Sequence, residues 1–176
     1  MRRRTLRLRD FNYSSARGYY FTSCVTGREH LFGSVGESEL FLNSAGQMVR
    51  DIWNKLPERF PSVTVDEFIV MPDHVHGIIL LDETRYDQQG VGAGLAPPIL
   101  KKGAPRDAPT LGQIVGAFKS ITAKSINTLL GRTGPVWQRN YYERVIRNEE
   151  EWNALRRYIR ENPLRWTLRQ NALKHV

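Results

Sequence analysis

Apolar residues recur along the chain with the two-residue spacing of strands in some segments and with helical spacing in others. Residues 18–26 are aromatic and β-branched and predict a buried strand, and residues 39–42 give a weaker strand signal. Residues 63–71 and 74–81 are also strand-like, and the Pro-Asp dipeptide between them is typical of a turn. These two runs therefore predict a hairpin in the centre of a sheet.

Two segments combine a helix start signal with apolar residues three and four positions apart. The first begins at Ser44, which a glutamine follows three residues later as in a capping box, and ends before Pro57. The second begins in the same way at Thr110 and ends near Gly131. Each predicts an amphipathic helix packed on the sheet.

The last part of the chain predicts a further strand and a third helix. Residues 136–138 and 141–146 indicate a short strand pair or one bent strand. Asn148 is a typical N-cap, and three glutamates after it suit the helix dipole, so a helix is expected to run to about Asn162. The order of elements predicts an α+β fold with a ferredoxin-like antiparallel sheet and helices packed on one face.

Length and composition favour one folded domain. The chain has 176 residues, 40% of them hydrophobic and 25% charged, which is enough for a single core. We expect the domain at 18–166, a basic N-terminal arm at 1–17 and a C-terminal tail at 167–176. Residues 83–110 are rich in glycine and proline and predict a flexible insertion within the domain.

Charge and cysteine content narrow the possible partners. The 26 basic and 18 acidic residues give a net charge of +8, which favours a polyanion such as nucleic acid. The chain has one cysteine, so it forms no internal disulfide and no cysteine-based zinc cluster. No apolar stretch is long enough for a membrane span or follows the first arginines as in a secretory signal. The expected location is the cytoplasm, in association with the nucleoid.

His74 and His76 are the first candidates for chemistry. They are separated by one residue in a predicted strand, so both imidazoles project to the same face while Val75 projects to the other. This is a geometry in which two side chains can share a metal ion. Two histidines on a polar strand face fit the same pattern without a metal, and a third ligand is needed to decide.

Tyr158 and Asn162 form a second pair, one helical turn apart. They flank the apolar stripe of the third helix, a position that suits residues facing a cleft. A tyrosine at such a border usually packs against the core with its hydroxyl in water. Asn162 stands before Pro163 and is equally suited to end a helix.

Two motifs resemble a known family. Met71-Pro-Asp-His-Val-His-Gly77 resembles the histidine–hydrophobe–histidine motif of single-tyrosine HUH transposases. Residues 137–148 and 158–166 are similar to the REP-associated tyrosine transposases, domesticated relatives that act on palindromic bacterial repeats. The resemblance extends from about residue 18 to residue 166.

The resemblance implies an enzyme and assigns its parts. His74 and His76 correspond to the metal ligands, Tyr158 to the nucleophile and Asn162 to the third ligand, where relatives often carry glutamine. The implied activity is a strand-transferase that nicks and rejoins single-stranded DNA at hairpins through a 5′-phosphotyrosine. The mixed nitrogen and oxygen ligands suit Mg²⁺ or Mn²⁺. Family members occur as monomers and as homodimers.

Other tyrosines and several basic residues remain open. Tyr141 and Tyr142 are adjacent in a strand-like segment, so one faces each side of the sheet, and Tyr142 is the main competing nucleophile. Basic side chains that could contact DNA are Arg2, Arg3, Arg4, Lys119, Lys124, Arg156 and Arg160. The arm could equally be a solvated tail, and charged helix faces usually serve solubility.

Two other functions are compatible with the same residues. One is a catalytically idle nucleic-acid-binding module on a ferredoxin-like sheet, which would bind a hairpin without a metal. The other is a replication or conjugation initiator of the wider HUH group, for which 176 residues leave little room.

Overall fold

The computed structural model describes residues 16–36, 39–82 and 109–174. Residues 1–15 and 83–108 lie outside the described part, and with them the arm residues Arg2, Arg3 and Arg4 and most of the expected insertion. The elements in chain order are β1 Ala16–Cys24, η1 Thr26–Arg28, β2 Gly33–Gly36, β3 Glu39–Leu42, α1 Ser44–Asn54, α2 Leu56–Arg59, β4 Val63–Met71, β5 His74–Asp82, α4 Leu111–Leu130, β6 Tyr142–Ile146, α5 Glu149–Arg160 and α6 Asn162–Lys174.

Four antiparallel strands form the main sheet in the order β4-β5-β1-β6. This order, with one helix connection before β4 and another before β6, is the ferredoxin-like arrangement and confirms the predicted fold class. The predicted hairpin forms between β4 and β5. Its second strand is central as expected, whereas β4 is an edge strand because only β5 pairs with it.

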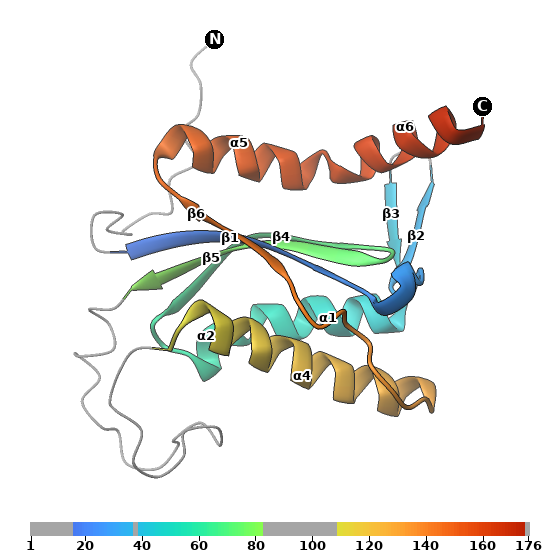
Figure 1. Ribbon diagram of the computed structural model, residues 1–176, viewed down its shortest axis with the longest axis horizontal. Helices are drawn as coiled ribbons and strands as arrows, with labels where there is room; N and C mark the ends of the chain where they lie inside the picture. The colour runs from blue at the N-terminus through green and yellow to red at the C-terminus, as the bar shows by residue number, and fades with distance from the viewer. Residues whose placement is uncertain (1–15, 37–38, 83–108, 175–176) are drawn as a thin grey trace.

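Helices cover both faces of the sheet, which corrects the expectation that all of them lie on one face. Figure 1 shows α1, α2 and α4 on one side and α5 and α6 on the other. The reason lies in the strands, whose alternate side chains are apolar on both faces. Phe21 packs in the cluster beneath α1 and α4, whereas Tyr20 and Ile78 pack in a second cluster with Trp152 and Ile159 of α5.

Close packing between α5 and the sheet depends on a glycine. A Cβ atom at Gly18 of β1 would lie 2.1 Å from Cζ3 of Trp152. Any larger residue at this position would push α5 away from the sheet.

Three helix starts show how closely the sequence sets the boundaries. Thr110 caps α4 with the predicted capping box, and the Asn148 side chain caps α5. The first helix differs by one residue, because Asn43 rather than Ser44 is its N-cap and accepts a hydrogen bond from the Gly46 amide. Asparagine is at least as good a cap as serine, so the earlier residue takes the role.

The chain continues as a helix beyond the predicted end at Asn162. After a break at Glu161, α6 runs through Lys174, so most of the segment expected as a tail is helical. Pro163 stands in the first turn of α6, where it needs no amide donor. The new helix packs on the β2–β3 hairpin, which holds it over the end of the sheet where β5 begins.

No helix in the described ranges is both long and apolar enough to cross a bilayer.

Candidate active site

His74 and His76 begin β5 and project together toward the layer of α5 and α6. Both side chains are buried, and their Nε2 atoms lie 3.0 Å apart. Strand alternation produces this arrangement, as the sequence predicted, since Val75 packs in the opposite core.

The other nitrogen of each imidazole is held by a hydrogen bond. Nδ1 of His74 lies 2.5 Å from Oδ1 of Asp73. Nδ1 of His76 lies 2.7 Å from the Tyr20 hydroxyl and 2.8 Å from Oγ1 of Thr22. These partners orient the rings so that both Nε2 atoms face one space, as the outer partners of metal-binding histidines do.

Sequence reasoning missed these three partners. Thr22 pairs with His76 across β1 and β5, and Tyr20 lies two residues away on the same strand face. The register between distant strands has no local signal, so only Asp73, adjacent to His74, could have been found from the sequence.

Burial and nearby charges set the protonation of these groups. Burial, assisted by electrostatic interactions with His74 and Arg28, lowers the pKa of His76 to about 3, so its ring is neutral. Burial raises the pKa of Tyr20 to about 12, which keeps its phenol protonated. Burial also opposes ionisation of Asp73, but its hydrogen bond and electrostatic interaction with His74 and the charge of Arg28 outweigh it and lower the pKa of that carboxyl.

The structure brings Tyr158 and Trp166 to the histidine pair. The Tyr158 ring centroid lies 5.4 Å from that of His76, and the Trp166 ring stacks on His74 at 5.8 Å. Asn162 is buried and begins α6, four residues after Tyr158 and four before Trp166 in the sequence.

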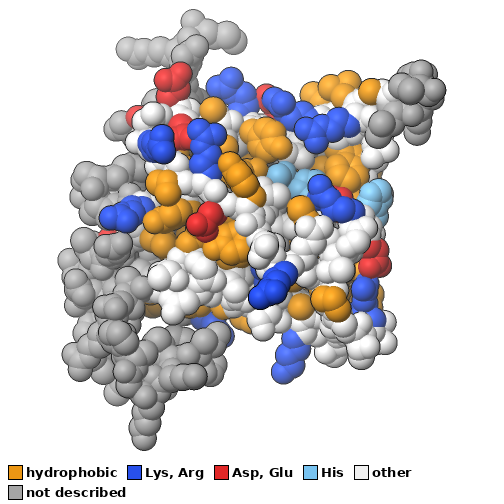
Figure 2. Space-filling view, viewed as in Figure 1, with side chains coloured by type: hydrophobic (Ala, Val, Ile, Leu, Met, Phe, Trp, Pro, Cys, Tyr) orange, Lys and Arg blue, Asp and Glu red, His pale blue; other side chains and the backbone are white. Residues whose placement is uncertain are grey.

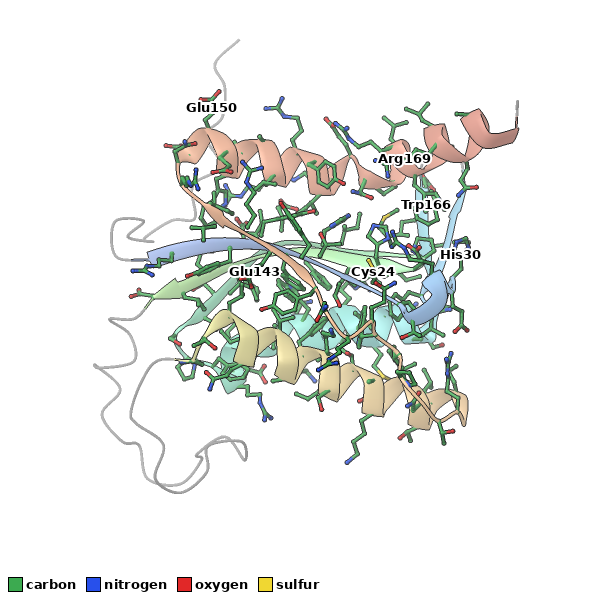
Figure 3. All side chains as sticks on the ribbon, in the orientation of Figure 1. Cys24, His30, Glu143, Glu150, Trp166 and Arg169 are labelled. Carbon is green, nitrogen blue, oxygen red and sulfur yellow. The ribbon has the colours of Figure 1, made fainter. Side chains whose placement is uncertain are left out.

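Basic and aromatic side chains surround this group. The guanidinium of Arg165 lies 5.4 Å from the centre of the Tyr158 ring. His30, to which the sequence gave no role, makes an edge contact with Trp166 at 5.4 Å. Figure 3 shows Trp166 and His30 together where α6 passes the β2–β3 hairpin, with Arg169 on the same helix. Figure 2 shows histidine and basic side chains side by side at this surface.

Four basic residues that were expected to contact DNA have specific places in the structure. Lys119 and Lys124 lie on α4, across the sheet from the histidines, so they do not line a path to this site. Arg156 is buried and paired with Asp66, because its position on α5 faces β4 rather than solvent. Arg160 is more exposed and binds Glu67 through Nε at 2.8 Å.

The two adjacent tyrosines face opposite sides of the sheet, as predicted. Tyr141 packs against Phe21 in the core beneath α4. Tyr142 lies on the histidine side, with its ring 6.3 Å from Tyr20. No contact of Tyr142 with either histidine is found, whereas Tyr158 contacts His76 directly.

The two Nε2 atoms, 3.0 Å apart, are close enough for both imidazoles to bind one cation. Within the described residues, no three histidine, cysteine or acidic side chains gather around a metal position. A third protein ligand at this site would therefore be a neutral oxygen such as that of Asn162.

Comparisons with known proteins identify the family and the fold. No protein-family model matches the chain. An uncharacterized protein of Haemophilus influenzae is 37% identical over 166 residues, which cover 93% of this chain and 89% of the relative. The chain belongs to the same family as that protein.

A solved structure shows the same fold. It is a REP-associated tyrosine transposase bound to a REP hairpin, with a TM-score of 0.53, 19% identity, and coverage of 91% of this chain and 74% of that chain. The predicted resemblance to the REP-associated tyrosine transposases is thereby confirmed for the fold.

Proposed function

We propose that the chain is a single-tyrosine HUH enzyme that cleaves and rejoins single-stranded DNA beside hairpins. The observation that carries this proposal is the contact between Tyr158 and His76, whose ring centroids are 5.4 Å apart. Among the described residues, two tyrosines have ring contacts with the histidine pair, Tyr20 and Tyr158. The Tyr20 hydroxyl is within hydrogen-bond distance of His76, which leaves Tyr158 as the tyrosine beside the two convergent Nε2 atoms. The fold shared with a REP-associated tyrosine transposase supports the same function.

His74, His76 and Asn162 would hold the divalent cation, Mg²⁺ or Mn²⁺. The 3.0 Å separation of the Nε2 atoms and the neutral state of His76 support this assignment. When bound, the cation would act as a Lewis acid toward a non-bridging phosphate oxygen. Asn162 is shorter than the glutamine of the family pattern, and its assignment is supported by the resemblance and by its burial at the start of α6.

Tyr158 would act as the nucleophile. Its phenol gives up a proton to solvent, and its oxygen forms a bond to phosphorus as the bond from phosphorus to the 3′ oxygen breaks. The 3′ oxygen takes a proton from solvent, which leaves a 5′-phosphotyrosine and a free 3′-hydroxyl. Attack by a 3′-hydroxyl on the phosphotyrosine reverses the step and joins strands without another energy source.

The DNA partner would be a REP-like hairpin with unpaired flanks. The net charge of +8 supports a polyanionic partner, and the solved neighbour is bound to a REP hairpin. Arg165 lies directly beside Tyr158 and is a suitable cation for the cleaved phosphate. The site is built within one chain, which is compatible with a monomer and with a homodimer.

A covalent-adduct assay tests the proposal. The protein is incubated with a labelled REP-like hairpin oligonucleotide and Mn²⁺ and then denatured in detergent. We expect a labelled adduct that Tyr158→Phe abolishes and Tyr142→Phe leaves intact. An adduct that persists in Tyr158→Phe, or that forms in neither protein, contradicts the proposal.

The second candidate is a nucleic-acid-binding module without catalysis. It is favoured by the distance of 3.0 Å between the two Nε2 atoms, since one neutral histidine can donate a hydrogen bond to the other without a metal. This alternative predicts hairpin binding that chelator and His74→Ala leave unchanged, and no adduct with any metal.

A further inference from the structure

Tyr142 lies on the same face of the sheet as the histidine pair. It begins the edge strand β6, opposite Thr22 of β1, and Thr22 is in turn opposite His76 of β5. Residues paired across antiparallel strands project to the same face. The three side chains therefore form one row across the sheet, with Tyr142 two strands, or about 10 Å, from His76.

The Tyr142 side chain is exposed in spite of its aromatic ring. It is 58% exposed, and its ring meets Tyr20 edge-on at 6.3 Å. The Tyr20 ring lies 6.4 Å from that of Tyr158. One side of the Tyr142 ring thus contacts Tyr20, while most of its surface faces solvent.

The neighbouring charge indicates what this ring binds. Arg144 projects to the same strand face, is 56% exposed and pairs with Glu151 at the start of α5. An exposed ring beside an exposed guanidinium is the combination that proteins use for single-stranded nucleic acid, with stacking for the base and positive charge for the phosphate. The row ends at His76, which would bind the cation that contacts the phosphate in the proposed function.

We propose that Tyr142 is the stacking platform of a nucleobase subsite at the β6 edge, which takes one unpaired base of the strand next to the cleaved phosphate. This inference rests on the proposed function for its DNA partner. It assigns Tyr142 a binding role and leaves the nucleophile role with Tyr158. Because every base has a π face, the subsite would tolerate any base.

Fluorescence of 2-aminopurine tests the subsite without chemistry. The probe is a REP-like hairpin oligonucleotide with 2-aminopurine at successive unpaired flank positions, and the titrations are made in EDTA. We expect binding to quench one flank position in the native protein and in Tyr142→Phe, which keeps the ring. Tyr142→Ala should lose the quenching and about five- to a hundredfold in affinity.

Three controls separate stacking from damage to the fold. Leu130 ends α4, across the sheet from the histidines, and is 47% exposed, so Leu130→Ala removes exposed apolar surface away from the site and should change neither readout. Tyr142→Leu suits a strand, retains apolar surface and should fail like the alanine variant. The loss in affinity should be the same factor at low and high salt, because a neutral ring releases no counterions.

The outcomes distinguish this inference from the proposed function. Unchanged quenching and affinity in Tyr142→Ala and Tyr142→Leu overturn the subsite, whether or not an adduct forms through Tyr158. Loss of the adduct in Tyr142→Phe also overturns it, because Tyr142 would then be the nucleophile. Quenching that depends on Tyr142 without any adduct supports the subsite and overturns the proposed chemistry.

Discussion

The orientation of the His74 ring depends on the carboxylate of Asp73. It lies 2.5 Å from Nδ1 of His74 and is buried, so its charge acts on the imidazole with little screening by water. Replacing it with the equally sized amide would keep the shape and remove the charge. We predict that Asp73→Asn weakens Mn²⁺ binding by about 10- to 100-fold, as other losses of outer partners do.

Calorimetric titration with Mn²⁺ measures this effect. Asp51→Asn on α1 is the matched control, because Asp51 is an exposed carboxylate that lies across the sheet from the histidines. Equal affinities of the two variants would show that Asp73 does not orient the ligand.

Cys24 offers a prediction about pH. Burial raises the pKa of its thiol, and the charge and hydrogen bond of Arg28, whose Nη1 lies 3.1 Å from Sγ, counteract this only in part. The reactive thiolate is therefore scarcer at pH 7 than in the unfolded chain. We predict slow alkylation of Cys24 by iodoacetamide at pH 7. The rate should increase with pH, and the pH at the midpoint of this increase should be higher for the folded protein than for the chain unfolded in urea.

Arg28→Gln sharpens the same experiment. It removes the group that lowers the pKa of Cys24, so the midpoint of the rate profile should move further upward. A midpoint at or below that of the unfolded chain would contradict the effect of burial.

At the scale of elements, one buried carboxylate fastens α5 to the sheet. Oδ2 of Asp66 on β4 accepts hydrogen bonds from Trp152 Nε1 at 2.5 Å and from Arg156 Nε at 2.8 Å. The side chains of Arg156 and Asp66 are only 6% and 8% exposed. We predict that Asp66→Ala lowers the free energy of unfolding by about 3 kcal/mol, because a buried charge loses its partner carboxylate.

Urea unfolding tests this prediction against a neighbouring pair. Glu67 is the next residue on β4 and binds Arg160 near the surface, so Glu67→Ala should cost at most about 1 kcal/mol. Adduct formation should fall in Asp66→Ala as well, since α5 carries Tyr158. Equal stabilities of the two variants would show that burial of the pair is unimportant.

Most elements could be predicted from the sequence because their signals are local. The hairpin of β4 and β5, the capping box of α4 and the N-cap of α5 all depend on neighbouring residues. The place of α5 on the second face could not be predicted in this way. It depends on Gly18, Tyr20 and Asp66 from separate strands meeting one helix.

In the candidate site as well, local features could be predicted from the sequence and contacts between distant segments could not. The shared face of His74 and His76 follows from strand periodicity, whereas the direction of their rings depends on Asp73, Tyr20 and Thr22. The approach of Tyr158 depends on the docking of α5, and the contacts of Trp166 with His74 and His30 depend on α6, which the sequence did not predict beyond Asn162. Basic residues were assigned to DNA by charge, and Arg156 shows that charge does not reveal which side of a helix is buried.

For the whole molecule, the proposed site joins the sheet to the helical layer that carries Tyr158 and Asn162. The histidines belong to the central strand β5, and Asn162 belongs to the helical layer that covers it. A ligand that binds all three would bind the folded chain and not the unfolded one. Its binding free energy then adds to the stability of the fold.

Thermal unfolding with Mn²⁺ therefore tests the arrangement of both layers at once. At a free concentration about 100 times Kd, stability should rise by about 2.7 kcal/mol, or roughly 5–10 °C in Tm for a chain of this size. His76→Ala should abolish the shift, and Asn162→Ala should reduce it while the histidines keep part of the affinity. The shift within each variant is compared with and without metal, so any loss of stability from the substitution itself cancels. A shift of equal size in His76→Ala would place the metal elsewhere, and no shift in the native protein would favour the binding module without a metal.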